Sequence, residues 1–470
     1  MKDPSQSEWP GGQLSSVYEE VLNWETIEGI YQYRIDDVPL WRLIRNTTIV
    51  NECVKRGLEK SHRVAGFTSA GAFALAKGLL RSTLQLTNVP KADLLFWGVG
   101  RRQKTAEGFA SPLIDPIIDL LPQFDSVLFE RPLSGKHFQP AVTKKLIWYD
   151  APKVQARIRA RVGNSIPAAQ RATIEALAAE VTKRFSVPKE KVIRRLQIEL
   201  AAFQYEKQAA TRIVAGAKPR AVLFTNRWVN YGVIAACREL DVPSYELQHG
   251  AVGKVGFKYH TPYDPVLDPD GFLVFAREWL SSEWGLPQDR VHNVGAPFIW
   301  SQRERLKNVP RGSKIMLVSQ PNLSKELSAA FDEICTAFQD KRFLLQLHPQ
   351  DRHQVEKRYP VSLRPNVEVV QEDRPLYESF VDCQAAIGQD STALLEASFF
   401  GLKVGLMNLE AALQNPIRDR IGSDNFFHAN SIDEVAEMLI SPRANEALGG
   451  NGYFDAFNAQ KLANLLAGGS

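Results

Sequence analysis

The sequence predicts an α/β protein built from two doubly wound, Rossmann-like domains that face a central cleft. From residue 220 onward, short apolar segments of strand length alternate with helical segments, which favours parallel sheets covered by helices on both faces. A turn-rich joint, Val309-Pro310-Arg311-Gly312-Ser313, divides these segments into two series. A chain of 470 residues also exceeds one ordinary hydrophobic core. We therefore expect domains at residues 1–309 and 310–470.

The N-terminal domain is expected to combine a parallel sheet with added helices. Residues 1–60 have a helical pattern after a polar start, and residues 150–216 have the pattern of two or three amphipathic helices. Short apolar runs rich in β-branched and aromatic residues predict the strands. These strands are expected at residues 93–99, 127–129, 221–225, 244–248, 271–275 and 291–294.

The C-terminal domain is expected to form a second sheet of the same kind. Its strands are expected at residues 314–319, 343–347, 367–370, 385–387 and 403–407. Its helices are expected at residues 323–339, 376–380, 393–400 and 431–439. The tail, residues 454–466, also has a helical pattern and is expected to pack back onto the first domain.

The composition is that of a soluble globular protein, with 44% hydrophobic and 23% charged residues. The four cysteines are far apart and form no CxxC pair, which argues against a disulfide framework or a zinc knuckle and favours a reducing compartment. The N-terminus lacks the apolar segment of a signal peptide, and no apolar run reaches the roughly 18 residues that a membrane span requires. We therefore expect a cytoplasmic protein.

Positive charge is concentrated in one segment. The net charge is +4 overall, whereas residues 153–220 hold 15 Lys/Arg and 5 Asp/Glu, a net of +10. This concentration indicates an anionic partner, either a membrane surface, an acidic glycan or a nucleic acid, unless it is only a solvated face. The apolar stretch at residues 64–84 is expected to form a largely buried helix, with a helix lying on a bilayer surface as the alternative. Peripheral attachment to the inner membrane is therefore expected.

Two strand ends of the second domain carry groups suited to binding phosphate. His348-Pro349 ends an apolar strand, and because Pro349 cannot continue a central strand, His348 should leave the sheet at its carboxyl edge. Ser391-Thr392 opens the helix after another strand, where hydroxyls and helix amides form a natural phosphate site. Glu396 lies one turn further on the same helix face, where a carboxylate can accept both ribose hydroxyls of a nucleotide.

Two glutamines are expected to line the same edge. Gln320 follows the first strand of this domain, and Gln389 comes shortly before Ser391. Structural alternatives exist, since Ser391 could simply cap a helix, His348 could be an ordinary loop residue and Glu396 an exposed helix charge. Taken together in this order, the residues predict a nucleotide site at the carboxyl edge of the second sheet.

The first domain offers three candidates for a general base. Asp115 is ranked first because a carboxylate is ionised at neutral pH, although it could instead cap the helix that begins at Pro116. His249 is ranked second because Gly250 lets the chain turn directly after a strand, which leaves the imidazole at the carboxyl edge. Glu246 is ranked third because its side chain could point into the core, where it would need a partner.

A basic loop follows the first strand of this domain. Arg101, Arg102 and Lys104 stand close together directly after the apolar run at residues 93–99. They could hold an anionic acceptor or a carboxylate of the donor, and a solvated loop is the alternative.

These residues resemble the motifs of GT-B glycosyltransferases of bacterial surface-polysaccharide biosynthesis. The resemblance is strongest to CMP-sugar-dependent Kdo transferases and bacterial sialyltransferases, whose HP and Ser-Ser/Thr motifs contact the nucleotide. His348-Pro349 and Ser391-Thr392 stand at the matching positions. Leu247-Gln248-His249-Gly250, Pro39-Leu40-Trp41-Arg42 and Asp115-Pro116-Ile117 look like a wider group of polysaccharide-biosynthesis proteins. The acidic-acidic-Gly motif that supplies the sialyltransferase base has no match at the first domain's strands, so the three candidate bases stay open.

The resemblance implies an inverting glycosyltransferase whose second domain binds a nucleotide-sugar donor and whose first domain binds the acceptor. The expected donor substrate is a CMP-activated acidic sugar such as Kdo or sialic acid, and the expected acceptor is a bacterial surface glycan or a lipid-linked molecule. No separate cofactor and no nucleic acid partner are expected. The alternatives are a UDP-sugar, GDP-sugar or CDP-glycerol donor, or a two-domain protein that binds a nucleotide or glycan without catalysis.

Metal independence is also expected, because no DxD-type carboxylate pair stands at a strand end that faces the cleft. Asp36-Asp37 and Asp268-Pro269-Asp270 are the weaker candidates for such a pair.

Overall fold

The structure is a computed structural model that describes most of the chain apart from its two ends and several internal segments. The described residues are 10–56, 69–105, 107–133, 135–162, 168–250, 258–281, 284–348, 351–352, 355–371, 374–389, 391–409, 425–441 and 452–467.

The first domain is built on a sheet of seven parallel strands in the order β11-β10-β9-β8-β3-β6-β7. The order reverses at the central strand β3, and β3, β8, β9 and β10 are buried along almost their whole length, as expected of a sheet covered on both faces. The strands are β3 (Leu94–Val99), β6 (Ser126–Arg131), β7 (Leu146–Trp148), β8 (Ala221–Phe224), β9 (Ser244–Leu247), β10 (Gly271–Val274) and β11 (Val291–Asn293).

The second domain contains six parallel strands in the order β14-β13-β12-β15-β16-β17. The order reverses at β12, so this domain is doubly wound as well. The strands are β12 (Lys314–Val318), β13 (Phe343–Gln346), β14 (Val367–Val369), β15 (Cys383–Gly388), β16 (Lys403–Leu406) and β17 (Phe426–His428). The two sheets lie on either side of the joint that the sequence predicts near residue 310.

Helices surround both sheets, and two short antiparallel ladders lie outside them. The ladders are β1 (Arg34–Ile35) with β2 (Val38–Pro39), and β4 (Gln103–Thr105) with β5 (Gly108–Ala110). The helices before the joint are α1 (Pro10–Ile27), α2 (Leu40–Lys55), α3 (Ser69–Leu86), α4 (Asp115–Leu120), α5 (Asp150–Val162), α6 (Ala168–Phe185), α7 (Lys189–Ala217), α8 (Tyr231–Glu239) and α9 (Pro297–Leu306). Those after it are α10 (Ser324–Ala337), α11 (Val355–Arg358), α12 (Leu376–Val381), α13 (Thr392–Phe399), α14 (Ile432–Ile440) and α15 (Ala459–Ala467). Within the described residues, none of these helices has the length and apolar character needed to cross a membrane.

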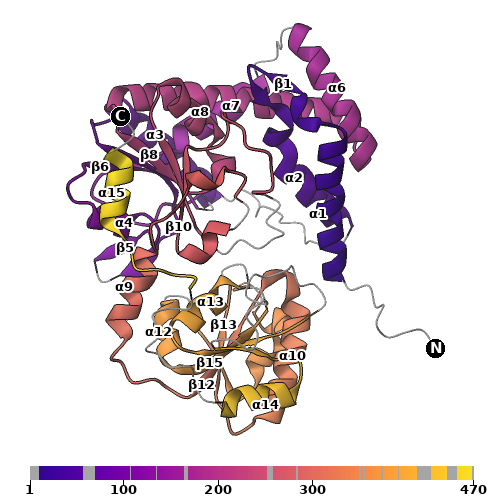
Figure 1. Ribbon diagram of the computed structural model, residues 1–470, viewed down its shortest axis with the longest axis vertical. Coiled ribbons are helices and arrows are strands. Elements are labelled where there is room, and N and C mark those ends of the chain that lie inside the picture. Colours follow the sequence, from indigo (N-terminus) through magenta and orange to yellow (C-terminus); the bar gives the residue numbers. More distant parts are fainter. Residues whose placement is uncertain are drawn as a thin grey trace.

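The carboxyl edges of the two sheets meet where the domains touch. A Cβ added at Gly250, just past β9, would lie 3.9 Å from the hydroxyl oxygen of Thr392, just past β15. The last helix, α15, returns to the first domain, where Leu462, Ala463 and Leu466 join the core formed by β3 and its neighbours (Figure 1). Two doubly wound domains in this arrangement form the GT-B α/β fold that the sequence predicts.

The N-terminal helices form a core of their own beside the first sheet. Trp24 of α1, Trp41 of α2 and Phe185 of α6 pack together, with ring centroids 5.2–5.9 Å apart. The indole N–H of Trp41 donates to Glu25 at 2.6 Å, and the Arg45 guanidinium binds the same carboxylate at 2.5 Å. The added helices of the first domain therefore have their own apolar and polar anchors.

Two buried arginines and two buried carboxylates join these helices to the sheet. Arg42 of α2 binds Asp268 through two contacts of 2.7 and 3.2 Å. Arg227 binds Asp268 at 3.0 Å and Glu246 of β9 at 2.5 Å. Burial alone would raise the pKa of Asp268, but Arg42 and Arg227 outweigh that effect and lower it. We call these four residues the buried ion network.

Arg42→Ala is expected to lower the free energy of unfolding by about 3–5 kcal/mol, because it leaves the Asp268 carboxylate buried with only one of its two arginine partners. The matched control is Arg220→Ala, which removes an exposed ion pair of 3.1 Å to Asp93 and should cost less than about 1 kcal/mol. Urea unfolding of both variants measures the two losses, and equal losses would contradict a structural role for the network.

Candidate active site

Three neighbouring strands of the second sheet deliver predicted site residues to one edge. The strands β13, β12 and β15 are adjacent and parallel, so they all end at the same edge. His348 follows β13, Gln320 follows β12 and Ser391 follows β15. The topology therefore brings together residues that are up to 71 positions apart in the sequence.

A buried carboxylate, Asp351, holds the turn on which His348 lies. The Ser319 hydroxyl accepts from the backbone N–H of His348 at 2.7 Å and donates to Asp351 at 2.8 Å, while Arg358 binds Asp351 at 2.6 Å. Burial lowers the pKa of His348, with Asp351 opposing the shift, so the imidazole is mainly neutral at pH 7. Asp351 is not among the residues predicted from the sequence, although its place three residues after His348 is a usable signal.

The N-terminus of α13 presents a hydroxyl and the positive end of its helix to the same edge. Ser391 caps the helix, because its hydroxyl accepts from the backbone N–H of Ala393 at 3.3 Å. Thr392, the first helical residue, lies opposite Gly250 of the other domain. Capping and phosphate binding are compatible, since the N–H groups at a helix N-terminus point along the helix axis and the helix dipole favours an anion there.

Glu396 lies one turn further along α13 and is half-buried. The hydroxyl of Tyr377 on α12 is hydrogen-bonded to its carboxyl group. Burial raises the pKa of Glu396 to about 7, and the bond to Tyr377 opposes this rise. At neutral pH this group is therefore partly protonated and can both donate to and accept from a hydroxyl.

Gln389 is predicted to line the nucleotide site, but its side-chain amide is bound to the backbone of Leu409 instead. Gln389 is buried, and its amide donates to the backbone oxygen of Leu409 at 3.1 Å and accepts from the backbone N–H of Leu409 at 3.2 Å. It therefore anchors the segment after β16. Gln320 is half-buried at the edge, and its backbone exchanges two 3.1 Å hydrogen bonds with the Tyr359 hydroxyl. Pro349 lies outside the described residues.

His249 leaves the edge of the first sheet directly opposite α13. Its ring packs edge-on against Trp228 with centroids 5.9 Å apart, and its Nδ1 atom is buried with no hydrogen-bond partner among the described residues. Burial lowers the pKa of His249 to about 4, and the charges of Arg101 and Lys258 add to the shift. At neutral pH the imidazole is thus uncharged and able to accept a proton.

The charge of Arg101 influences a histidine in each of the two domains. Arg101 is exposed just past β3, and its charge lowers the pKa of both His249 in the first domain and His348 in the second. Lys258 lies over the Trp228 ring, 5.3 Å from its centroid, and its charge also lowers the pKa of His249. The prediction that Arg102 belongs to this basic group is wrong, because Arg102 is buried.

Glu246 and Asp115, the other two candidate bases, are both buried and fully engaged. Glu246 belongs to the buried ion network and also accepts from the Tyr259 hydroxyl at 3.1 Å. Asp115 accepts from the backbone N–H of Ser111 at 2.7 Å and from Arg102 at 3.2 Å. We therefore withdraw both as bases, since neither carboxylate is open to an acceptor hydroxyl, and His249 moves to first rank.

Two of the four carboxylates considered for a metal, Asp268 and Asp270, are engaged in ion pairs. Asp268 lies in the buried ion network, and Asp270 binds Arg238 at 2.8 Å. Among the residues that the structure describes, no group of three or more His, Cys, Asp or Glu side chains is arranged to hold a metal ion.

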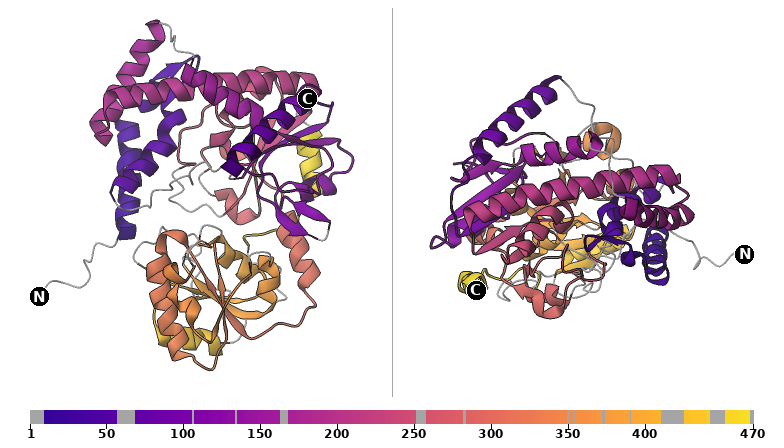
Figure 2. Two further views of the ribbon diagram at one scale, coloured as in Figure 1. Left: turned by 180° about the vertical axis from the view of Figure 1, so that it is seen from behind. Right: turned by 90° about the horizontal axis from the view of Figure 1, so that it is seen from above.

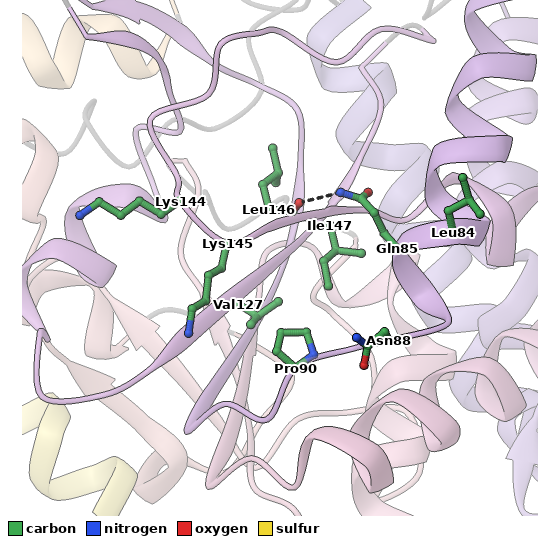
Figure 3. Close-up of a pocket in the computed structure, with 9 residues that line it drawn as sticks. All are labelled: Leu84, Gln85, Asn88, Pro90, Val127, Lys144, Lys145, Leu146 and Ile147. Carbon is green, nitrogen blue, oxygen red and sulfur yellow. Dashed lines mark hydrogen bonds between the residues drawn. The ribbon is translucent and has the colours of Figure 1, made fainter.

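A pocket of about 280 Å³ lies away from these residues (Figure 3). Val127 and Leu146, near the amino ends of β6 and β7, form its floor, so it opens at the opposite edge of the first sheet from His249. Its lining residues are Leu84, Gln85, Asn88, Pro90, Val127, Lys144, Lys145, Leu146 and Ile147.

Comparison with known proteins gives only distant structural similarities. No protein-family model matches the sequence, and no curated protein matches it. A UDP-GlcNAc 2-epimerase from Neisseria meningitidis bound to UDP-GlcNAc has a TM-score of 0.47 and 10% identity, covering 80% of this chain and 100% of that chain. The glycotransferase of kitacinnamycin has a TM-score of 0.43 and 12% identity, covering 81% and 99%. CalG4, the calicheamicin glycosyltransferase, has a TM-score of 0.39 and 13% identity, covering 75% and 90%. The fold assignment rests on the two sheets of the chain itself.

The imidazole of His249 should titrate with a midpoint near pH 4 in the folded protein. Because the unfolded chain binds this proton near pH 6.5, folding stability should fall as the pH drops from about 6.5 to 4. NMR titration of the histidine rings, with His249→Gln to assign the signal, measures the midpoint. A midpoint at or above 6.5 would contradict the burial of this ring.

Proposed function

We propose that the protein is an inverting glycosyltransferase that uses a nucleotide-sugar donor. One observation carries this proposal: a helix N-terminus with His348 on one domain faces an uncharged, half-buried histidine on the other. Phosphate binds well where helix amides and a hydroxyl converge. A neutral imidazole opposite that point has the protonation state of a general base.

The proposed reaction is a single displacement at the anomeric carbon. His249 takes the proton from the acceptor hydroxyl, whose oxygen forms the new glycosidic bond as the bond to the nucleotide phosphate breaks. The phosphate leaves with the electron pair, stabilised by the amides of α13, the Ser391 hydroxyl and His348. Because base and leaving group lie on opposite sides of the sugar, the configuration inverts. The negative donor also offsets Arg101 and Lys258, which raises the pKa of His249 at the moment it must accept a proton.

We propose a CMP-activated acidic sugar, such as Kdo or sialic acid, as the donor. The support is the resemblance of the His348 and Ser391 motifs, together with Arg101, which is exposed, whose charge acts on both histidines and which could pair with a sugar carboxylate. Glu396 beside Tyr377 would bind the ribose hydroxyls. A UDP-sugar, which needs no carboxylate partner at Arg101, is the alternative.

The proposed acceptor is a bacterial surface glycan or a lipid-linked molecule, bound by the first domain. The protein would then work in the cytoplasm at the surface of the inner membrane. No separate cofactor takes part in the proposed reaction, because displacement of a nucleotide needs only a base and stabilisation of the leaving phosphate.

Donor binding is expected to depend on His348 and Ser391. A nucleotide that binds only the folded state raises the melting temperature more the more tightly it binds. Among CMP, UDP, GDP, dTDP and CDP, we expect the largest rise with CMP, because it is the nucleotide of the proposed donor. His348→Ala and Ser391→Ala should each weaken its binding by one to three decades, or about 1.4–4 kcal/mol.

Ser431→Ala is the matched control for this prediction. Ser431 caps α14 as Ser391 caps α13, so each substitution should cost about 1 kcal/mol of stability. Only Ser391→Ala should lose nucleotide binding. Equal nucleotide binding by the two variants would show that the site is wrongly placed, whereas a larger shift with UDP than with CMP would reject only the donor assignment.

His249→Ala is expected to lower kcat by about 10²–10⁴ while nucleotide binding is kept, because it removes the base without touching the donor side. The control is His292→Ala on β11, whose pKa burial also lowers but whose ring lies near Lys461 of α15. Transfer assays and nucleotide titrations on both variants decide the point. If His249→Ala keeps more than about a tenth of the wild-type kcat, the base lies elsewhere.

A further inference from the structure

Two neighbouring helices of the first domain, α3 and α5, expose large apolar side chains on their outer faces. They pack against each other and lie beside the first sheet (Figure 2). Leu80 and Leu84 of α3 are 65% and 63% exposed, and Ile158 and Val162 of α5 are 54% and 76% exposed. Each pair is four residues apart and therefore shares one helix face. The expectation that this part of the chain is a largely buried helix is wrong for Leu80 and Leu84.

The same two helices are strongly basic. Together they contain six Lys or Arg residues and one acidic residue, Asp150, which is buried and bound to His137 at 2.8 Å. The exposed cations that surround the apolar pairs are Lys77, Arg81, Arg157, Arg159 and Arg161. Arg157 is paired with Glu199 at 2.6 Å, while no carboxylate partner lies near Lys77 or Arg161 among the described residues.

The basic surface continues along the edge of the sheet. The pocket in Figure 3 opens beside Leu84, and Lys144 and Lys145 form part of its wall. Because Lys145 is paired with Asp125, Lys144 is the residue at this pocket that adds positive charge to the basic surface. The apolar pairs are thus flanked by cations on the helices and at the adjoining pocket. We call this surface the α3–α5 face.

We propose that the α3–α5 face binds the surface of an anionic lipid bilayer. Aligned apolar side chains enter the boundary between headgroups and acyl chains, and the surrounding lysines and arginines reach the lipid phosphates. This combination distinguishes a bilayer from other partners. A second copy of the chain would place two basic faces against each other, and a nucleic acid would leave the apolar pairs without a partner. The proposal does not depend on the reaction proposed above.

Sedimentation with lipid vesicles tests the proposal on the full chain. The protein should bind vesicles of phosphatidylcholine with added phosphatidylglycerol, but not phosphatidylcholine alone, and binding should weaken as salt screens the charges. Leu84→Ser with Val162→Ser, and separately Lys77→Glu with Arg161→Glu, should each weaken binding by at least about tenfold. All four residues are exposed, so the melting temperature should stay close to that of the wild type.

Matched controls come from the second domain. Ile440→Ser changes an apolar residue that is 84% exposed on α14, and Lys357→Glu changes an exposed cation on α11. Both should bind vesicles as the wild type does. Absence of binding to anionic vesicles at low salt, or equal loss in the controls, would overturn the proposal. A dimer in light scattering that disappears in the α3–α5 variants would assign the face to a second copy and would overturn it as well.

Discussion

The position of the first-domain site depends on the buried ion network. Arg227 links Glu246, inside β9, with Asp268, and Arg42 joins Asp268 to the N-terminal helices. Two arginines and two carboxylates are paired in a buried region, where removal of Arg227 would leave Glu246 without a cation and removal of Asp268 would leave Arg42 without a carboxylate. Since β9 ends only two residues before His249, the network also fixes where that imidazole emerges. The charged residues of this domain thus divide into a buried structural set and an exposed set.

The separation of buried ion pairs from exposed charges determines what chemistry is possible where the two domains meet. The carboxylates of Glu246 and Asp115 are held in buried ion pairs and are not open to a substrate hydroxyl. The charges that act on His249 at the carboxyl edge of the sheet are the cations Arg101 and Lys258. Burial is the main cause of the lowered pKa of His249 and of His348, and the charge of Arg101 adds to the shift of both. An anionic donor would reverse this balance, so substrate binding and activation of the base become coupled through a single electrostatic effect.

The sequence is sufficient to predict the two sheets and the ends of their strands. Strands and helices can be read from local patterns of apolar residues. A parallel topology then places the carboxyl ends of the strands at one edge, which is why His348 and Ser391 can be placed together from sequence alone. Side-chain partners are different. The role of Glu246 depends on Arg227, and that of Asp115 depends on Arg102, so neither burial follows from a local pattern. The exposure of Leu84 is equally hidden, because an apolar helix pattern does not tell which face a neighbour covers.

The central claim is that a nucleotide binds where the carboxyl edges of the two sheets meet. A crystal structure of the protein with bound CMP tests it most directly. The account predicts that the phosphate lies at the N-terminus of α13, within hydrogen-bond distance of Ser391 and His348, with the ribose toward Glu396. A nucleotide bound elsewhere, for example against Lys144 at the opposite edge of the first sheet, would contradict the account.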